Sequence, residues 1–108
     1  MPTLEVDRYT LDCGEERQRT SPESFELPSE SKRQNLARGD CVKLIFRMLN
    51  KINEIEVERM WVDVEGKDGN YYIGSLNNEP FSDVDLASED RVIFEARHVI
   101  QIYDEKPK

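Results

Sequence analysis

The clearest pattern in the chain is a pair of alternating runs within residues 58–76. Apolar side chains at positions 60, 62 and 64 alternate with Trp61 and acidic residues, and an aromatic run starts at Tyr71 and Tyr72 after a Gly-Lys-Asp-Gly-Asn break. Alternation with a period of two is typical of a half-buried strand, and a glycine-rich break is typical of a turn. Residues 58–76 therefore predict a β-hairpin. The two tyrosines should face opposite sides of the sheet, which leaves one of them exposed.

Other short apolar runs predict further strands. Residues 40–48 are the most apolar candidate, with one face in the core and the other half exposed. Residues 91–95 and 99–103 predict two more strands, and the alternating residues 4–9 predict a short first or edge strand. Residues 49–57 then join the apolar strand to the hairpin, through either a short helical turn or a long loop.

One short helix is predicted on the surface, over residues 29–39. Ser29 can cap its first turn, basic side chains follow, and Gly39 stands just past its end. Only Leu36 and Ala37 give this helix an apolar contact.

Two segments of the chain resemble each other. Residues 36–42 and residues 86–92 match at Leu, Ala, Asp and Val. In each segment a leucine precedes a turn that ends in Asp, and a strand begins directly afterwards. We interpret this as repeated local geometry and not as a duplication.

Together these elements predict a mainly β protein with a short helix, arranged as a small, strongly bent antiparallel sheet or an SH3-like small barrel. Residues 36–103 should form this barrel-like domain. Residues 1–35 should be poorly ordered or extended apart from the edge strand at 4–9, because Phe25 and Leu27 are the only large apolar side chains in residues 13–35. Residues 104–108 should form a flexible tail.

Charge narrows the choice of partner. The formal net charge is −8 over 108 residues, which argues against nucleic-acid binding because such proteins neutralise phosphates with a basic face. An acidic surface suits either plain solubility or a basic protein partner. The longest apolar run is too short to span a bilayer, and no run resembles a signal peptide. We therefore expect no membrane partner and a cytoplasmic protein in which Cys13 and Cys41 stay reduced.

Five short motifs follow one another in a fixed order. They are Gly39-Asp40-x-Val42-Lys43-Leu44-Ile45-Phe46, Glu58-Arg59-x-Trp61-Val62-x-Val64, Gly74-x-Leu76-x-Asn78-x-Pro80, Asp90-x-Val92-x-Phe94 and His98-x-Ile100-x-Ile102. Their order and spacing resemble a small bacterial family of unknown function, the YegJ-like domain, over roughly residues 25–103. Ser88-Glu89-Asp90 departs from the Gly-Asp turn usual in that family, and residues 51–57 form a long connection. The resemblance implies a fold and a bacterial origin, and it carries no activity.

The sequence predicts no catalytic residues, no metal site and no cofactor. His98 is the sole histidine, and the simplest interpretation is a histidine at a strand start that is satisfied by a backbone group. Cys41 begins a strand, and no serine stands in a Gly-x-Ser-x-Gly turn. The acidic run at positions 83, 85, 89 and 90 lacks the glycine and the terminal glutamate of a calcium loop.

A candidate binding surface is predicted instead. Its residues are Glu58, Arg59, Trp61, Tyr71, Asn78 and His98. An ion pair beside an exposed indole would form a platform for an arginine or a planar ligand. Alternatively, Trp61 plugs one end of a small barrel and the charges form its solvated rim.

Three functions fit this pattern. The leading hypothesis is a non-enzymatic module that binds another protein, preferably a basic one, through the outer face of the hairpin. One version is an immunity-type protein that neutralises a basic toxin. The alternative is a small hydrolase-type enzyme with His98 as base and carboxylates from Glu58 or Asp90. The third is a scaffold subunit that oligomerises through an exposed strand edge, so the oligomeric state stays open.

Overall fold

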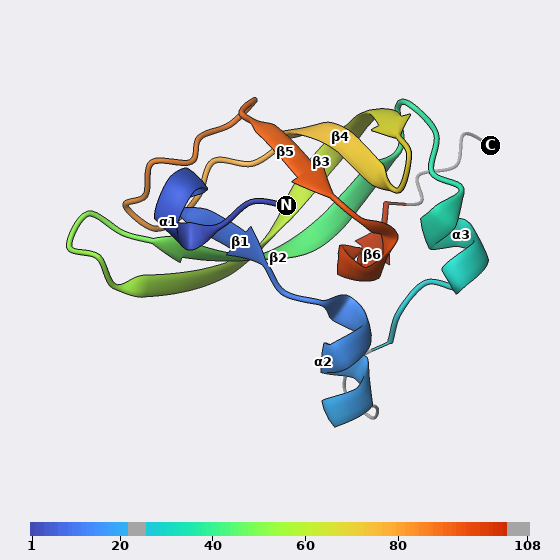
Figure 1. Ribbon diagram of the computed structural model, residues 1–108, viewed down its shortest axis with the longest axis horizontal. Coiled ribbons are helices and arrows are strands. Elements are labelled where there is room, and N and C mark those ends of the chain that lie inside the picture. Colours follow the sequence, from blue (N-terminus) through green and yellow to red (C-terminus); the bar gives the residue numbers. More distant parts are fainter. Residues whose placement is uncertain (22–25, 104–108) are drawn as a thin grey trace.

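The computed structural model describes residues 1–21 and 26–103 and is built around one antiparallel sheet (Figure 1). Its strands are β1 (Tyr9–Leu11), β2 (Cys41–Leu49), β3 (Ile55–Asp68), β4 (Tyr71–Leu76), β5 (Arg91–Phe94) and β6 (Gln101–Ile102). The strands are ordered β1-β2-β3-β4-β5, and β6 pairs with β2. The sheet curls into a half-barrel, which confirms the prediction of a mainly β fold with a strongly bent antiparallel sheet.

Strands β3 and β4 form the predicted hairpin. A register shift between Val64 and Gly66 marks a β-bulge, which bends the strand and increases the curl of the sheet. Tyr72 is 1% exposed and Tyr71 is 44% exposed, so the two tyrosines do face opposite sides.

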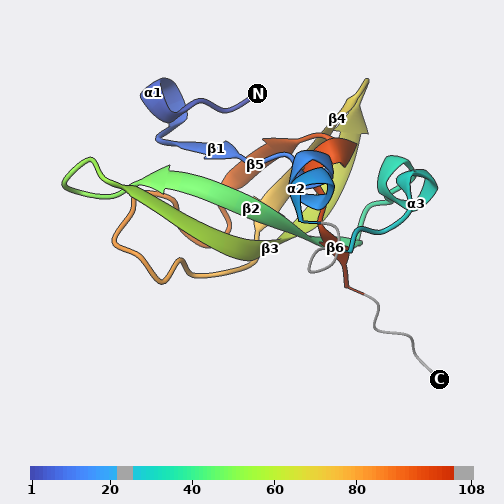
Figure 2. The same cartoon turned by 90° about the horizontal axis from the view of Figure 1, so that it is seen from below.

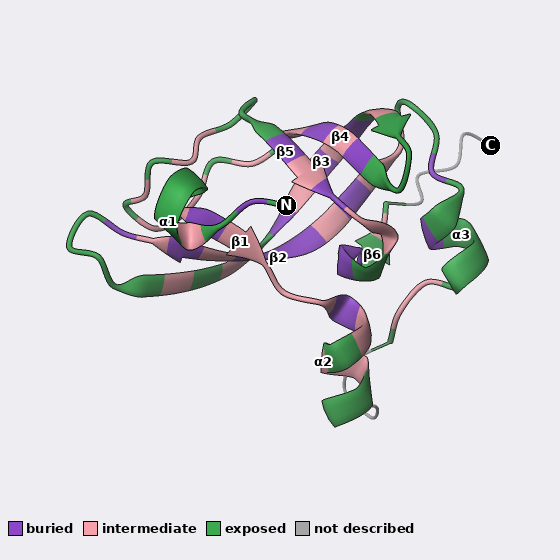
Figure 3. Cartoon of the chain, viewed as in Figure 1, coloured by how far each residue is buried: buried purple, intermediate pink, exposed green. Residues whose placement is uncertain are grey.

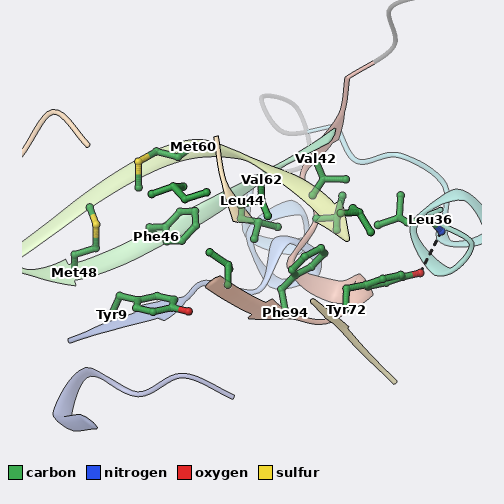
Figure 4. Close-up of a cluster of buried hydrophobic side chains, with 14 residues drawn as sticks. Tyr9, Leu36, Val42, Leu44, Phe46, Met48, Met60, Val62, Tyr72 and Phe94 are labelled. Carbon is green, nitrogen blue, oxygen red and sulfur yellow. Dashed lines mark hydrogen bonds between the residues drawn. The ribbon is translucent and has the colours of Figure 1, made fainter. Parts of the chain in front are cut away.

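Alternate residues of the long strands point into the main core (Figure 4), and burial alternates along these strands (Figure 3). Ile45 and Ile100 form a separate, smaller buried cluster. The core side chains of the sheet are Tyr9, Val42, Leu44, Phe46, Met48, Met60, Val62, Val64, Tyr72, Leu76, Val92 and Phe94. Tyr72 lies at one end of this core, where its ring stacks on Phe94 with centroids 5.3 Å apart. Its hydroxyl accepts the N–H of Leu36 (Figure 4) and donates to the carbonyl of Arg33, which fastens residues 33–36 to the sheet.

The helices are short and lie around the sheet. They are α1 (Leu4–Asp7), α2 (Gly14–Thr20), α3 (Glu30–Gln34) and the 3-10 turn η1 (Ala96–His98). Ser29 caps α3 as predicted, since its hydroxyl accepts the N–H of Lys32 at 3.2 Å. The helix is shorter than predicted because it ends at Gln34, so Leu36 and Ala37 lie beyond it. In residues 1–21 and 26–103, no helix has both the length and the apolar character needed to cross a membrane.

The N-terminal segment differs from its prediction. The edge strand predicted at 4–9 is wrong for its first half, where Leu4–Asp7 is a helix capped by the hydroxyl of Thr3. The strand starts only at Tyr9 and pairs with β2. The described part of residues 1–35 thus holds one strand and three short helices. Phe25 and the predicted tail at 104–108 lie outside the described residues.

The two similar segments share one turn geometry. The N–H of Ala37 donates to the carboxylate of Asp40 at 2.8 Å, and the N–H of Ala87 donates to that of Asp90 at 2.9 Å. Gly39 has a φ of 98°, and Glu89 occupies the equivalent left-handed position with a φ of 76°. The prediction of repeated local geometry is confirmed, and Glu89 takes the conformation for which a glycine is usual.

The connection between β2 and β3 is shorter than predicted. The strands continue to Leu49 and from Ile55, so only a tight loop remains between them. The side-chain oxygen of Asn50 accepts the N–H groups of Ile52 and Glu54, which closes this loop without a helical turn. The C-terminal strand is also shorter than predicted, because β6 covers only Gln101–Ile102.

Candidate functional site

The outer face of the sheet carries side chains that alternate with the core. In the register of β2 and β3, Cys41 lies opposite Asp63 and Lys43 lies opposite Trp61. Their inward neighbours Val42 and Val62 are fully buried. Since strand side chains alternate between faces, these four residues form one cluster on the side away from the core.

A cleft of about 400 Å³ opens within this cluster, and we call it the outer cleft. Its lining residues are Cys41, Trp61, Asp63, Asn77 and Tyr103. Tyr103 reaches it from beyond β6, because its N–H donates to the carbonyl of Cys41 at 2.8 Å. The rings of Tyr103 and Trp61 then meet edge to face, with centroids 5.6 Å apart and planes at 81°. This geometry is favourable for an aromatic pair, so the rings form a stable wall.

Trp61 is held in place by its backbone. Its N–H donates to the side-chain oxygen of Asn78 at 2.6 Å, and its carbonyl accepts the N–H of Asn77 at 2.8 Å. The Nζ of Lys43 lies 4.8 Å from the centroid of the indole, a cation–π contact. Trp61 therefore lies half-buried on the outer face, and the alternative in which it plugs a barrel end is wrong.

Asp63 forms the polar wall of the outer cleft. Its carboxylate accepts a bond of 3.3 Å from the amide of Asn77 and a further bond from the Cys41 thiol. Burial, together with the neighbouring Asp63, raises the pKa of the Cys41 thiol to about 11. The thiol stays protonated near neutral pH, and a thiol is a much weaker nucleophile than a thiolate. The ion pairs that link described residues do not include Asp63.

His98 lies inside the protein and not on the predicted surface. It is 2% exposed and ends the turn η1. Its Nδ1 accepts the backbone N–H of Glu95 at 2.9 Å, and the Glu95 side chain accepts the N–H of His98 in return. Burial, helped by Arg97, lowers the pKa of His98 to about 4. The inclusion of His98 in an exposed binding surface is therefore wrong, because a neutral buried imidazole closes this turn.

This burial predicts a loss of stability in acid. The pKa of His98 is lower in the folded protein than the ordinary value of 6.5, so the unfolded chain takes up the proton first as the pH falls. The free energy of unfolding is therefore unaffected by this group above pH 6.5 and decreases as the pH falls toward 4. The decrease is up to about 3 kcal/mol, at about 1.4 kcal/mol per pKa unit. Urea unfolding across this range should show the loss. A His98→Asn variant keeps an acceptor but does not titrate, so its free energy of unfolding should depend less on pH over the same range. An equal dependence on pH in both proteins would refute this origin.

Glu58 and Asn78 fasten a loop. The Glu58 carboxylate accepts the N–H groups of Phe81 and Ser82 at 2.9 and 2.7 Å. Burial alone would raise the pKa of Glu58, but these bonds hold it below its ordinary value. Together with the bond from Trp61 to Asn78, they keep residues 77–90 beside strand β3 (Figure 2). Both residues are thus occupied in holding the loop.

The groups of the hydrolase hypothesis serve separate local structures. His98 closes η1, Glu58 binds the loop, and Asp90 accepts the N–H of Ala87 in its turn. The charged groups that act on the imidazole are Arg97, Glu95, the N-terminus and Asp12, and neither Glu58 nor Asp90 is among them. Within the described ranges, no group of three or more His, Cys, Asp or Glu residues is arranged to hold a metal ion.

The predicted surface is therefore divided among several places. Arg59 and Trp61 share the outer face of β3, whereas Tyr71 lies at the start of β4, beside the hairpin turn. Sequence reasoning missed the partners of Trp61 in the outer cleft, which are Cys41, Asp63, Asn77 and Tyr103. Asp63 could have been found, since the period that buries positions 60, 62 and 64 places Trp61 and Asp63 together on the opposite face.

Comparison with known proteins places the chain in a family. Residues 15–103 match the model of a family described as an uncharacterized protein conserved in bacteria (DUF2314). No curated protein and no solved structure matches the chain. The matched range contains strands β2 to β6 and every residue that lines the outer cleft. The chain therefore belongs to this family of uncharacterised proteins conserved in bacteria.

Proposed function

We propose that this chain is a non-enzymatic module that binds a basic protein partner through the outer cleft. The observation that carries the proposal is a half-buried carboxylate, Asp63, that lines the same cleft as two aromatic rings. Aromatic faces attract cations, and a carboxylate adds a charged acceptor. A Lys or Arg side chain of a partner protein would be stabilised by both walls at once.

The walls of the outer cleft suit the centre of a protein interface. Trp, Tyr and Arg are the residue types that most often dominate binding energy, and they do so where water is excluded. Trp61 and Tyr103 form such an anchor pair on a sheet face whose position is fixed by strand pairing. Since little backbone needs to be ordered on binding, little of the interaction energy is lost.

The charge of the whole chain favours the same kind of partner. A net charge of −8 attracts basic proteins over distances of about a Debye length and repels acidic ones. An immunity-type role, in which the chain neutralises a basic toxin, is one form of this function. The narrower assignment to the YegJ-like domain rests on the motif resemblance and adds no activity.

The proposal predicts that removal of either wall weakens binding to a basic peptide. The probe is a peptide of Arg, Lys and Gly, and its binding is measured by calorimetry at low ionic strength. Trp61→Ala and Asp63→Asn should each lose about 10-fold or more in affinity, as expected for anchors at the centre of an interface. Salt should weaken the wild-type binding, because part of the attraction is between charges.

Tyr71→Ala provides the matched control. Tyr71 is an exposed aromatic residue on the same hairpin, but it does not line the outer cleft. This variant should bind the peptide like the wild type, and all three variants should keep a cooperative unfolding transition. Equal affinity of wild type and Asp63→Asn, or equal binding of an acidic peptide, would refute the proposal.

A further inference from the structure

We infer that the outer cleft selects the guanidinium group of an arginine over the ammonium group of a lysine. The inference rests on the proposed function, because it names the side chain by which a basic partner is recognised. Three features support it: the exposed aromatic wall of the outer cleft, the remaining acceptor capacity of Asp63, and the position of Lys43 beside the cleft.

The aromatic wall offers exposed ring surface beside a carboxylate. Trp61 and Tyr103 meet edge to face at 81°, so the two rings form a corner, and Tyr103 remains 53% exposed. A guanidinium is planar and weakly hydrated, and it can stack on a ring while its N–H groups point sideways to a carboxylate. An ammonium is a compact and strongly hydrated point charge that gains less from such a wall.

Asp63 keeps acceptor capacity for a ligand. An ionised carboxylate has about four lone-pair sites, and the donors on Asp63 are the amide of Asn77, at a long 3.3 Å, and the Cys41 thiol, a weak donor. Both donors are neutral, so neither of them compensates the charge of Asp63. The fork of a guanidinium can donate two bonds to one carboxylate, which an ammonium cannot match in geometry.

Lys43 already places a compact cation on the indole. Its Nζ is 4.8 Å from the ring centroid, and Lys43 lies directly opposite Trp61 in the sheet. A second localised charge near this ammonium is repelled, whereas a guanidinium spreads its charge over three nitrogens and can bind from the side of Tyr103 and Asp63. Removal of the Lys43 charge should therefore strengthen the binding of a cationic ligand.

Two peptides test the selectivity. They have equal length, and one contains arginine and glycine while the other contains lysine and glycine. Trp61 is the only tryptophan of the chain, so its fluorescence reports binding to the full-length protein directly. The arginine peptide should bind about 5-fold more tightly or better, because a stacked guanidinium gains more from an aromatic face. Equal or tighter binding of the lysine peptide would overturn the inference and leave the proposed function standing; binding of neither would overturn both.

A Lys43→Gln variant tests the part played by Lys43. It should bind the arginine peptide about 3-fold more tightly, since one nearby repulsive charge in a partly solvated site is removed. Lys67→Gln is the matched control, because Lys67 also lies over a ring, 5.2 Å from the centroid of Tyr72, but outside the outer cleft. This control should leave the affinity close to that of the wild type. Unchanged or weaker binding by Lys43→Gln would overturn the role of Lys43 as a repulsive neighbour of the bound cation.

Discussion

Replacement of Tyr72 by Ala should unfold a large part of the protein near room temperature. The ring is 1% exposed and stacks on Phe94, so its loss costs about 3–5 kcal/mol in burial and cavity terms. The loss of the hydroxyl leaves the N–H of Leu36 and the carbonyl of Arg33 without their partner, at about 1–3 kcal/mol for a buried group. A total of about 5 kcal/mol or more is comparable to the whole stability of a small domain.

Urea unfolding followed by circular dichroism measures this effect. Tyr72→Phe separates the two contributions, because it keeps the ring and removes only the hydroxyl; it should cost about 2 kcal/mol. Tyr71→Ala, at the exposed neighbour, should cost less than about 1 kcal/mol. If Tyr72→Ala were no more destabilising than Tyr71→Ala, the placement of Tyr72 at the junction of sheet and helix α3 would be wrong.

Replacement of Gly74 by Val should prevent folding. A Cβ at Gly74 would lie 2.5 Å from the carbonyl oxygen of Asp63 and 2.7 Å from a methyl group of Val62. The first atom is backbone within a paired strand and the second is in the core, so neither can move without breaking the sheet. Overpacking of this kind costs about 3 kcal/mol for Ala, and more than about 4 kcal/mol for the larger valine.

Gly66 offers the control for this prediction. It lies on the other side of the same β-bulge, and a Cβ there meets nothing within 4 Å. Gly66→Ala should change the free energy of unfolding by less than about 1 kcal/mol. Thermal unfolding of Gly74→Ala and Gly66→Ala gives the comparison. Equal transition temperatures of these two variants would contradict the close approach of β3 to Gly74.

Much of the sheet could be predicted because its signals are local. The alternation at positions 60, 62 and 64 and the glycine-rich break determine a hairpin within a single stretch of sequence. The repeated turns could be predicted for the same reason, since Asp40 and Asp90 each bind a backbone N–H only three residues away. Helix α1 was missed because four residues are too few to show a helical period.

The outer cleft could not be predicted because it depends on register between distant strands. Cys41 meets Asp63 only through the pairing of β2 with β3, and Tyr103 arrives through the pairing of β6 with β2. Nothing near Trp61 in the sequence signals either neighbour. His98 was placed on the exposed surface for a different reason: a lone histidine between two predicted strands gives no sign that its ring will close a 3-10 turn inside the protein.

The most direct test of the account is a map of amide chemical shifts during titration with the arginine peptide. We expect the largest changes at the indole N–H of Trp61 and at the amides of Cys41, Asp63 and Tyr103, because these residues line the outer cleft. Changes centred on Tyr71 and the hairpin turn, or no changes at saturating peptide, would contradict it.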